Sequence, residues 1–406
     1  MKKIAIIGGG ASGLMAALFA ARAGADVTIY EHNNSVGKKI LASGNGRCNI
    51  INTTATHEDY SGTDPQFVTY SLKQLSFAYF EKLCHSIGLL LDIKDDGRCY
   101  PLSNEAKSVL LALKSAVEEA GVTILTESKV TMITKNATVF SVITALGKQN
   151  YDKVLIATGS EAAPQLGATN DGYTFARSLE HAIIPTYPSL VQLHLNSKNH
   201  HKMAGVKTTA EVTLIIDGKH STKVTGDILF ATYGISGLAT LDVSRRASYA
   251  LMNKQRVSIS LNLLPRYDRA SLVSIIEKLF ASVAKHDVYT ALCGVIPAKI
   301  ATYLLEDAVI PLSATVSSLN PKEIKRIVHL IGEWKFEVSD THGFKHAEVS
   351  GGGVATAQIN DKTMESKLVE GLYFGGEVLD IVGRRGGYNF NFAWASGMIA
   401  GKEMGK

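Results

Sequence analysis

Six residues near the start of the chain, Gly8-Gly9-Gly10-Ala11-Ser12-Gly13, match the pattern G-x-G-x-x-G. In this pattern the first glycine permits a tight turn, the second lets backbone approach a pyrophosphate, and the third lets a helix pack closely on a strand. The start of that helix presents unpaired N–H groups and a partial positive charge to phosphates. The motif therefore predicts a dinucleotide site at Gly8, Gly10, Ala11, Ser12 and Gly13, in preference to a glycine-rich turn without a ligand.

The residues around this motif form the elements that such a site requires. Residues 3–7 are apolar after Lys3 and predict a buried strand. Residues 12–23 predict a helix that ends at Gly24, and residues 26–30 predict a second strand. Together they make a strand–helix–strand unit of about 30 residues. Glu31 follows the second strand, 18 residues beyond Gly13, where a carboxylate accepts hydrogen bonds from a ribose.

The stretch from Ile4 to Ala21 carries no charge, which is also typical of a signal peptide or membrane anchor. Glycines interrupt it at the spacing of a strand, a turn and a helix. We therefore interpret it as a buried strand that leads into a buried helix, and we expect no membrane segment.

The four cysteines are scattered and form no C-x-x-C pair, which argues against a disulfide framework and against a zinc site. His200 and His201 lie in a polar stretch without ligand spacing, so we interpret them as surface residues. We expect a cytoplasmic protein without a metal. The formal charge of +5 and the pI of about 8.8 permit an anionic partner and fall short of the signature of a dedicated nucleic-acid binder.

The length of 406 residues predicts two or three domains. Residues 77–87 and 105–120 predict helices, the alternating stretch 122–142 predicts strands, and residues 153–157 predict a buried strand. Between 191 and 264, short alternating runs indicate a mostly antiparallel sheet or a small barrel. We predict an α/β fold in which residues 1–184 and 346–406 form one domain and residues 185–345 form an insert, with helices at about 266–334.

The end of the chain distinguishes between two dinucleotides, NAD and FAD. Residues 372–377 (LYFGGE) predict a strand that ends in two glycines and an acidic residue. In FAD proteins of the two-dinucleotide-binding type, a similar late strand brings an acidic side chain to the ribityl chain, whereas an NAD dehydrogenase has no need of it. The turn Ala157-Thr158-Gly159 also resembles a turn near FAD in those proteins. No second G-x-G-x-x-G is present, so NAD(P)H would dock only transiently.

Four longer segments carry a resemblance that covers essentially the whole chain. They are GKKILASGNGRCN (residues 37–49), LFATYGISGLATLDVSR (residues 229–245), the turn Gly351-Gly352-Gly353, and ESKLVEGLYFGGEVLDIVGRRGGYNFNFAWASG (residues 365–397). The chain resembles a bacterial flavoprotein family described as aminoacetone oxidase-like and as 3-dehydro-bile-acid reductase-like, which contains a ribosomal RNA dihydrouridine synthase. The resemblance implies a Rossmann-like FAD-binding domain with an inserted β-barrel and helical domain.

The resemblance also implies FAD contacts beyond the glycine motif. Glu31 would hold the adenosine ribose, Val130 would meet the adenine through its backbone, and Thr158 and Gly159 would lie near the pyrophosphate and ribose. The flavin side would be lined by Lys39, Ser43, Gly44, Gly46, Arg47, Cys48 and Asn49. The ribityl chain and the ring would be covered by Gly376, Glu377, Asp380, Gly387, Tyr388 and Asn389.

Three residues in these segments have two interpretations each. Cys48 is either a general acid beside the flavin or a small packing residue of a tight loop. Arg384 and Arg385 stand where the family commonly has a small residue and a threonine. They either bind a phosphate of the substrate or the flavin pyrimidine, or they are solvated loop charges.

Three hypotheses for the reaction follow. In the first, a polarised C=C bond is reduced with NAD(P)H as electron source; the substrate is a uridine in large-subunit ribosomal RNA or a small enone such as a steroid dienone. The uridine would be flipped out of folded RNA, and the basic pI favours RNA. The second is amine oxidation with oxygen, and the third is a non-catalytic role as an RNA-binding flavoprotein.

Overall fold

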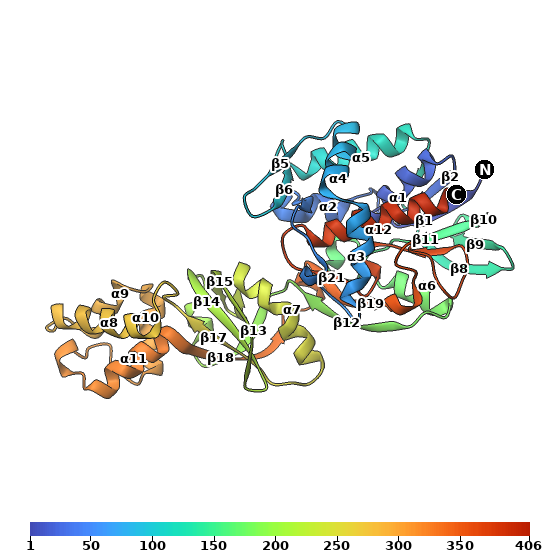
Figure 1. Ribbon diagram of the computed structural model, residues 1–406. Helices are drawn as coiled ribbons and strands as arrows, with labels where there is room; N and C mark the ends of the chain where they lie inside the picture. The colour runs from blue at the N-terminus through green and yellow to red at the C-terminus, as the bar shows by residue number, and fades with distance from the viewer. The chain divides into compact units, whose positions relative to one another are not determined.

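The computed structural model describes residues 1–406, which divide into two compact units (Figure 1). The first unit comprises Met1–Thr186 and Val349–Lys406, and the second comprises Tyr187–Glu348. The boundaries predicted from the sequence, after residues 184 and 345, lie within a few residues of these. The chain therefore leaves the first unit, builds the second, and returns.

A parallel five-stranded sheet of order β20-β11-β1-β2-β7 forms the centre of the first unit. Its strands are β1 (Lys3–Ile7), β2 (Asp26–Tyr30), β7 (Thr123–Leu125), β11 (Lys153–Ile156) and β20 (Leu372–Phe374). Ile4, Ala5 and Ile6 are fully buried, as expected for a parallel strand that is covered on both faces. Strand β20 pairs with β11, so the last part of the chain completes the sheet that the first part begins.

Two helices from opposite ends of the chain, α1 (Ala11–Arg22) and α12 (Tyr388–Met404), pack directly on each other beside this sheet (Figure 1). Glycines permit this close approach. A Cβ atom at Gly397 would lie 2.3 Å from the carbonyl oxygen of Ser12, and one at Gly401 would lie 2.3 Å from that of Ala16. No larger residue fits either position without moving a helix backbone.

The remaining elements of the first unit surround the sheet. The predicted helices at 77–87 and 105–120 are confirmed. Two further helices, at Val68–Gln74 and Asp171–Ser178, are too short and too polar to have been predicted. The helices are α2 (Lys38–Ala42), α3 (Val68–Gln74), α4 (Phe77–Ser86), α5 (Ala106–Glu119) and α6 (Asp171–Ser178). The strands are β3 (Ile51–Asn52), β4 (Tyr60–Ser61), β5 (Leu91–Ile93), β6 (Arg98–Pro101), β8 (Val130–Asn136), β9 (Val139–Thr144), β10 (Gly147–Tyr151), β12 (Ile183–Ser189), β19 (Val349–Val354) and β21 (Val382–Gly383).

The second unit is a closed barrel of order β13-β16-β15-β14-β17-β18, followed in Figure 1 by a group of helices at one end. The residue pattern alone left a sheet or a barrel open, the family resemblance implied a barrel, and the structure confirms the barrel. Its strands are β13 (Leu193–Asn196), β14 (Lys207–Ile216), β15 (Lys219–Ala231), β16 (Gly234–Ser236), β17 (Val257–Asn262) and β18 (Trp334–Thr341). The predicted helical region is confirmed as α8 (Arg269–Ser282), α9 (Val288–Cys293), α10 (Ala298–Asp307) and α11 (Pro321–Glu333).

One helix of the second unit, α7 (Leu238–Met252), was not predicted from the sequence. Its buried face consists mainly of Ala239, Val243 and Ala247 with serines between them, so its apolar periodicity is weak. It begins directly after Gly237, whose φ of 100° breaks the strand pattern. No helix of the structure is both long and apolar enough to cross a lipid bilayer.

Candidate functional site

The N-terminus of α1 carries no cap of its own. Gly10 is its N-cap residue, no side chain accepts a hydrogen bond there, and the first turn contains no acidic residue. A Cβ atom at Gly10 would meet nothing within 4 Å, so open space lies in front of the helix. The buried hydroxyl of Ser12 has no hydrogen-bond partner. Unpaired N–H groups, a positive helix end and an unpartnered hydroxyl together favour an anionic ligand at this position.

The other two glycines of the motif, Gly8 and Gly13, allow segments of backbone to pack closely. A Cβ atom at Gly13 would lie 1.9 Å from the carbonyl oxygen of Gly8. Gly8 has a φ of 108°, and a Cβ atom there would lie 2.5 Å from the carbonyl oxygen of Ala157. The structure thereby places the Ala157-Thr158-Gly159 turn, which follows strand β11, against the start of the glycine motif.

Glu31 directly follows strand β2, and its buried carboxylate faces the glycine motif. Its Oε2 accepts a hydrogen bond from the Gly9 amide at 3.0 Å, and its Oε1 accepts from the Asn33 amide at 2.8 Å. Its main-chain oxygen accepts from the Ser128 amide at 2.9 Å. Ser128 precedes the buried Val130, at the start of β8, by two residues. The predicted ribose and adenine contacts therefore stand on neighbouring segments.

Glu377 and Lys39, which are 338 positions apart in the sequence, form an ion pair with 2.6 Å between Nζ and Oε2. The second carboxylate oxygen of Glu377, Oε1, accepts from Ser160 Oγ at 2.8 Å and from the Ser350 amide at 2.9 Å. Lys39 and Glu377 were both predicted to contact the flavin end of the cofactor. Glu377 thus connects the segment after β11, strand β19, helix α2 and the segment after β20.

The preceding glycines connect this cluster to the dinucleotide motif. A Cβ atom at Gly376 would lie 2.9 Å from Ser12 Cβ, and one at Gly375 would lie 2.6 Å from Ser12 Oγ. The Gly376 amide donates to Ser396 Oγ in α12 at 2.9 Å. The late strand therefore ends directly against the start of α1, as the sequence argument for FAD requires.

The predicted flavin-side loop after α2 is exposed to solvent over most of its length and buried at one residue. Gly44, Gly46 and Arg47 are exposed, and a Cβ atom at Gly46 would meet nothing within 4 Å. Cys48, in contrast, is completely buried, and burial raises the pKa of its thiol to about 11. Ser43 Oγ donates to the Ile40 carbonyl at 2.7 Å and so closes the end of α2.

Interactions with the end of the chain position the residues that follow this loop. Asn49 Oδ1 accepts from the Cys99 amide at 3.3 Å, and a Cβ atom at Gly387 would lie 2.9 Å from that Oδ1. From α12, Asn391 Nδ2 donates to the Asn52 carbonyl at 3.0 Å, and Trp394 Nε1 donates to the Ile50 carbonyl at 2.7 Å. The segment around strand β3 is therefore held by side chains from the last helix of the chain.

The loop of the two arginines, residues 383–387, is braced by its own neighbours. Asn389 Oδ1 accepts from the Gly383 amide at 2.8 Å, and its Nδ2 donates to the Gly383 carbonyl at 3.1 Å. Arg384 forms an ion pair with Asp59 at 2.9 Å and lies over the ring of Tyr388, while 64% of its side chain stays exposed. Arg384 is thus both fixed by Asp59 and accessible to a ligand.

Asp380 is buried and accepts through Oδ2 from both the amide and the hydroxyl of Thr63, at 2.8 and 2.7 Å. Burial raises the pKa of this carboxyl group, while the bonds from Thr63 act in the opposite direction. Asp380 therefore holds residues 62–63 against the segment that follows Glu377.

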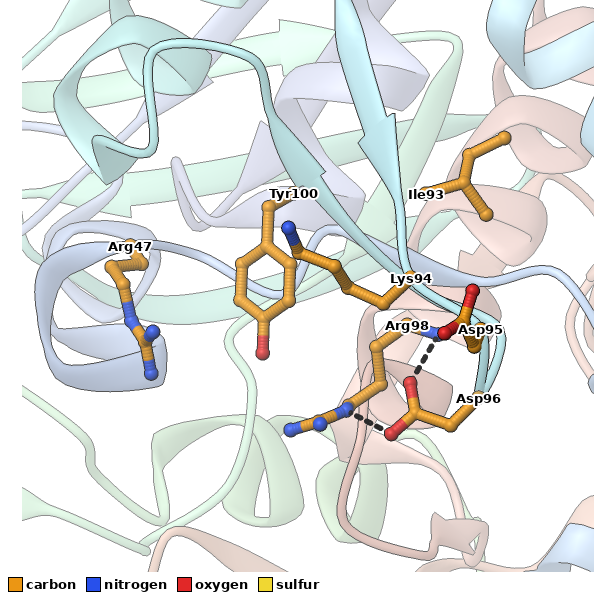
Figure 2. A pocket seen from close by; sticks show the side chains of 7 residues that line it. All are labelled: Arg47, Ile93, Lys94, Asp95, Asp96, Arg98 and Tyr100. Atoms are coloured by element: carbon orange, nitrogen blue, oxygen red, sulfur yellow. Dashed lines mark hydrogen bonds and ion pairs between the residues drawn. The ribbon is translucent and has the colours of Figure 1, made fainter.

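An open pocket of about 390 Å³ adjoins the arginine loop and the flavin-side loop (Figure 2). The Arg47 guanidinium lies 5.5 Å from the centre of the Tyr100 ring, and Arg98 is paired with Asp96 at 2.7 Å. A Cβ atom at Gly386 would lie 3.8 Å from Arg98 Cγ. The pocket is lined by Arg47, Ile93, Lys94, Asp95, Asp96, Arg98 and Tyr100.

Sequence reasoning missed several residues that hold these groups in place. Ser160 directly follows the Thr158-Gly159 turn, and Asn391 and Trp394 lie inside the conspicuous segment 365–397, so adjacency to a motif could have indicated all three. Asp59 and Thr63 lie in a stretch without a pattern, and no local signal indicates them.

The residues present fit FAD: an uncapped helix start with open space at Gly10 suits the pyrophosphate, and a carboxylate at the end of β2 suits the ribose. Together with the completing strand β20, fold and site define an FAD-dependent oxidoreductase. The match of residues 2–403 to the HI0933-like protein Rossmann domain assigns the chain to this family, which confirms the resemblance carried by the four longer segments.

Two relatives and one solved structure illustrate the likeness. The chain is 35% identical to a 3-dehydro-bile acid delta(4,6)-reductase of Clostridium scindens, over 99% of this chain and 98% of the relative. It is 32% identical to a ribosomal RNA dihydrouridine synthase of Haemophilus influenzae, over 96% of this chain and 95% of the relative. A 3-ketosteroid delta1-dehydrogenase from Sterolibacterium denitrificans shares the fold, with a TM-score of 0.53 at 12% identity over 100% of both chains.

Proposed function

We propose that this protein reduces a C=C bond conjugated to a carbonyl group, with NAD(P)H as electron source and a uridine of large-subunit ribosomal RNA as substrate. The net reaction oxidises NAD(P)H and adds a hydride and a proton across the C5=C6 bond of uracil. C6 takes the hydride because it is β to the C4 carbonyl, and C5 takes the proton.

The activities named for the two relatives support a common chemistry. A 3-dehydro-bile acid with double bonds at positions 4 and 6 and the uracil ring both contain an alkene conjugated to a carbonyl. The same hydride-then-proton addition reduces both, although one substrate is a lipid and the other a base in RNA. Shared chemistry on different substrates is expected when one fold hosts several functions.

The distribution of charge favours RNA over a steroid, and this observation carries the choice of substrate. The second unit, residues 187–348, contains 19 Lys and Arg against 14 Asp and Glu, a net charge of +5. The first unit contains 23 of each and is neutral. The net positive charge of the chain thus falls entirely in the insert. A net positive charge attracts a polyanion such as RNA more strongly than a steroid, which carries at most one carboxylate.

When bound, FAD supplies hydride transfer, and the chain supplies position and electrostatics. The N-terminus of α1 and Ser12 would bind the pyrophosphate, and Glu31 would bind the ribose. The Lys39–Glu377 ion pair would hold helix α2 against the segment after β20 on the flavin side. Arg384, fixed by Asp59 and accessible to a ligand, and Arg385 would bind a phosphate of the substrate.

Anaerobic turnover tests this proposal. FAD-loaded protein is reduced with NADH or NADPH and then mixed with a uridine-containing fragment of large-subunit ribosomal RNA or with a steroid dienone, the two candidate electron acceptors. We expect the RNA to reoxidise the protein and to gain dihydrouridine, measured by mass spectrometry of its nucleosides. A dihydrouridine map of ribosomal RNA from a deletion strain that equals the wild-type map would overturn the RNA assignment.

The small enone is the second candidate, because the bile-acid reductase is 35% identical to this chain. Reoxidation by the dienone with no response to RNA would establish it. Amine oxidation would instead be recognised by hydrogen peroxide production from aminoacetone without NAD(P)H. A non-catalytic role would be recognised by RNA binding that survives removal of the flavin, without turnover of any of the three substrates.

A further inference from the structure

Four rings gather at one edge of the barrel in the second unit. His194 lies in β13, Tyr233 in the turn between β15 and β16, His342 directly after β18, and His346 two residues beyond Phe344. Strand β13 pairs with both β16 and β18, and His194 stands opposite Gly234 on one side and Asp340 on the other. The barrel register therefore brings these rings together from three separate segments.

The rings form a stack. The rings of Tyr233 and His342 are 4.0 Å apart at an angle of 18°, and those of His342 and His346 are 4.0 Å apart at 34°. The rings of Tyr233 and His346 therefore both lie directly beside the ring of His342, Tyr233 stacked on it and His346 tilted against it. His194 Nε2 and His342 Nδ1 are 2.7 Å apart, and their hydrogen bond fixes the central ring.

The stack has a buried side and an exposed end. Tyr233, His194 and His342 are half-buried, whereas His346 and the adjacent Lys345 are exposed. No group of three or more His, Cys, Asp and Glu side chains in the structure is arranged to hold a metal ion. His346, the last ring of this cluster, is exposed, so a further planar ring can approach it from solvent.

We propose that His346 is a stacking platform for a base of single-stranded RNA, with Lys345 beside it to meet the adjoining phosphate. Sequence-tolerant binding of unpaired RNA uses this combination of aromatic faces and cations. The proposal rests on the RNA substrate proposed for the flavin site and assigns residues of the insert to its binding. Tyr233 belongs to the conspicuous segment 229–245, for which the FAD site provides no role.

Binding of a fluorescein-labelled single-stranded oligouridine to full-length, FAD-loaded protein tests the platform, measured by fluorescence anisotropy without NAD(P)H. We expect His346→Ala to weaken binding by roughly ten-fold, the effect of losing one base-stacking ring. His346→Phe, which keeps a ring and removes the imidazole, should restore binding to within about two-fold, because stacking needs only a planar face. His201→Ala is the matched control, since it removes another exposed histidine of the same unit.

Two results would overturn the platform: equal binding by His346→Ala and His201→Ala, or failure of His346→Phe to restore binding. Preserved binding of a fully paired RNA duplex by His346→Ala would support it, because paired bases offer no free face. Failure of the substrate assignment is distinguishable: wild-type protein would then bind oligouridine through His346 and form no dihydrouridine.

Discussion

At the scale of single residues, the glycine motif separates two physical roles that the pattern G-x-G-x-x-G combines. Gly13 leaves no room for a methyl group, since its Cβ would lie 1.9 Å from Gly8 O. Gly10 has open space in front of it and an extended backbone, with φ of −84° and ψ of −168°, that any residue adopts. Gly13 is therefore needed for helix α1 to pack against the turn, whereas Gly10 leaves space for the ligand.

Substitution by alanine should resolve these roles. Gly10→Ala should fold with a free energy of unfolding within about 0.5 kcal/mol of wild-type apoprotein and should purify with little flavin. Gly13→Ala should lose on the order of 3 kcal/mol or more, because backbone must move. Chemical denaturation and the flavin absorbance spectrum measure the two effects. Full flavin content in Gly10→Ala would contradict the assigned pyrophosphate position.

Cys48 illustrates a residue whose surroundings favour one of its two proposed roles, that of a packing residue. A proton donor has to reach its substrate, and Cys48 is fully buried with a pKa raised to about 11. We expect Cys48→Ala to turn over within about two-fold of wild type, since removal of a general acid costs about 10²- to 10⁴-fold. Stopped-flow reoxidation of the reduced protein measures the rate. A decrease within that larger range would restore the catalytic hypothesis.

His181 is expected to make the stability of the first unit sensitive to acid. Its Nδ1 is 2.8 Å from the Leu179 carbonyl and its Nε2 is 2.8 Å from Ser366 Oγ, and burial lowers its pKa. A histidine whose folded pKa lies below the ordinary value of about 6.5 contributes stability above that pH and loses it as the pH falls through the folded pKa.

The melting temperature should accordingly fall between neutral pH and about pH 5, the range in which a histidine with a lowered pKa becomes charged. His181→Phe should be less stable at neutral pH and should show a flatter dependence on pH. Differential scanning fluorimetry measures both, with His201→Ala as a control whose slope should match wild type. An unchanged slope in His181→Phe would assign the acid sensitivity to another group.

At the scale of elements, the contact of α1 with α12 links the two ends of the chain. Helix α1 presents the dinucleotide end, and α12 carries Asn391 and Trp394, which hold the segment around β3. The glycines of α12 set the distance between these helices, so their size governs both the pyrophosphate end and the flavin-side loop.

Gly401→Ala places a methyl group 2.3 Å from the carbonyl oxygen of Ala16. We expect a decrease of about 1–3 kcal/mol in the free energy of unfolding, the usual cost of overpacking, together with weaker retention of flavin. Glu403→Ala, on the same helix, should stay close to wild type, because its side chain forms a surface ion pair with Lys406. Equal denaturation midpoints for the two variants would refute the packing argument.

At the scale of the whole molecule, the first unit is neutral and the second is basic. The first unit contains every residue that we assign to FAD, and the second contains the excess positive charge and the ring stack. Because counterion release makes the binding of RNA dependent on salt, the contribution of each unit to that binding is measurable.

The double variant Lys198→Gln, Lys219→Gln removes two exposed positive charges from the second unit. We expect it to bind RNA more weakly and with a smaller dependence on salt. The logarithmic salt slope should decrease by about 0.7 for each RNA phosphate that the protein no longer neutralises. Lys107→Gln with Lys148→Gln removes the same charge from exposed positions of the first unit and should leave the slope unchanged. Anisotropy titrations at several salt concentrations measure both, and equal slopes for the two pairs would contradict a role of the insert in binding RNA.

Patterns within the sequence were sufficient to predict the strand–helix–strand unit, the position of Glu31 at the end of its second strand, and the late strand at residues 372–377. Local spacing encodes these features, because periodicity and glycine positions act over a few residues. The folded chain was needed to show that Glu377 pairs with Lys39, that Cys48 is sealed from solvent, that the strands of the insert close into a barrel, and that His346 ends a stack. Each of these depends on which distant segments pack together, and packing is set by the shape of the whole core, which no short pattern specifies.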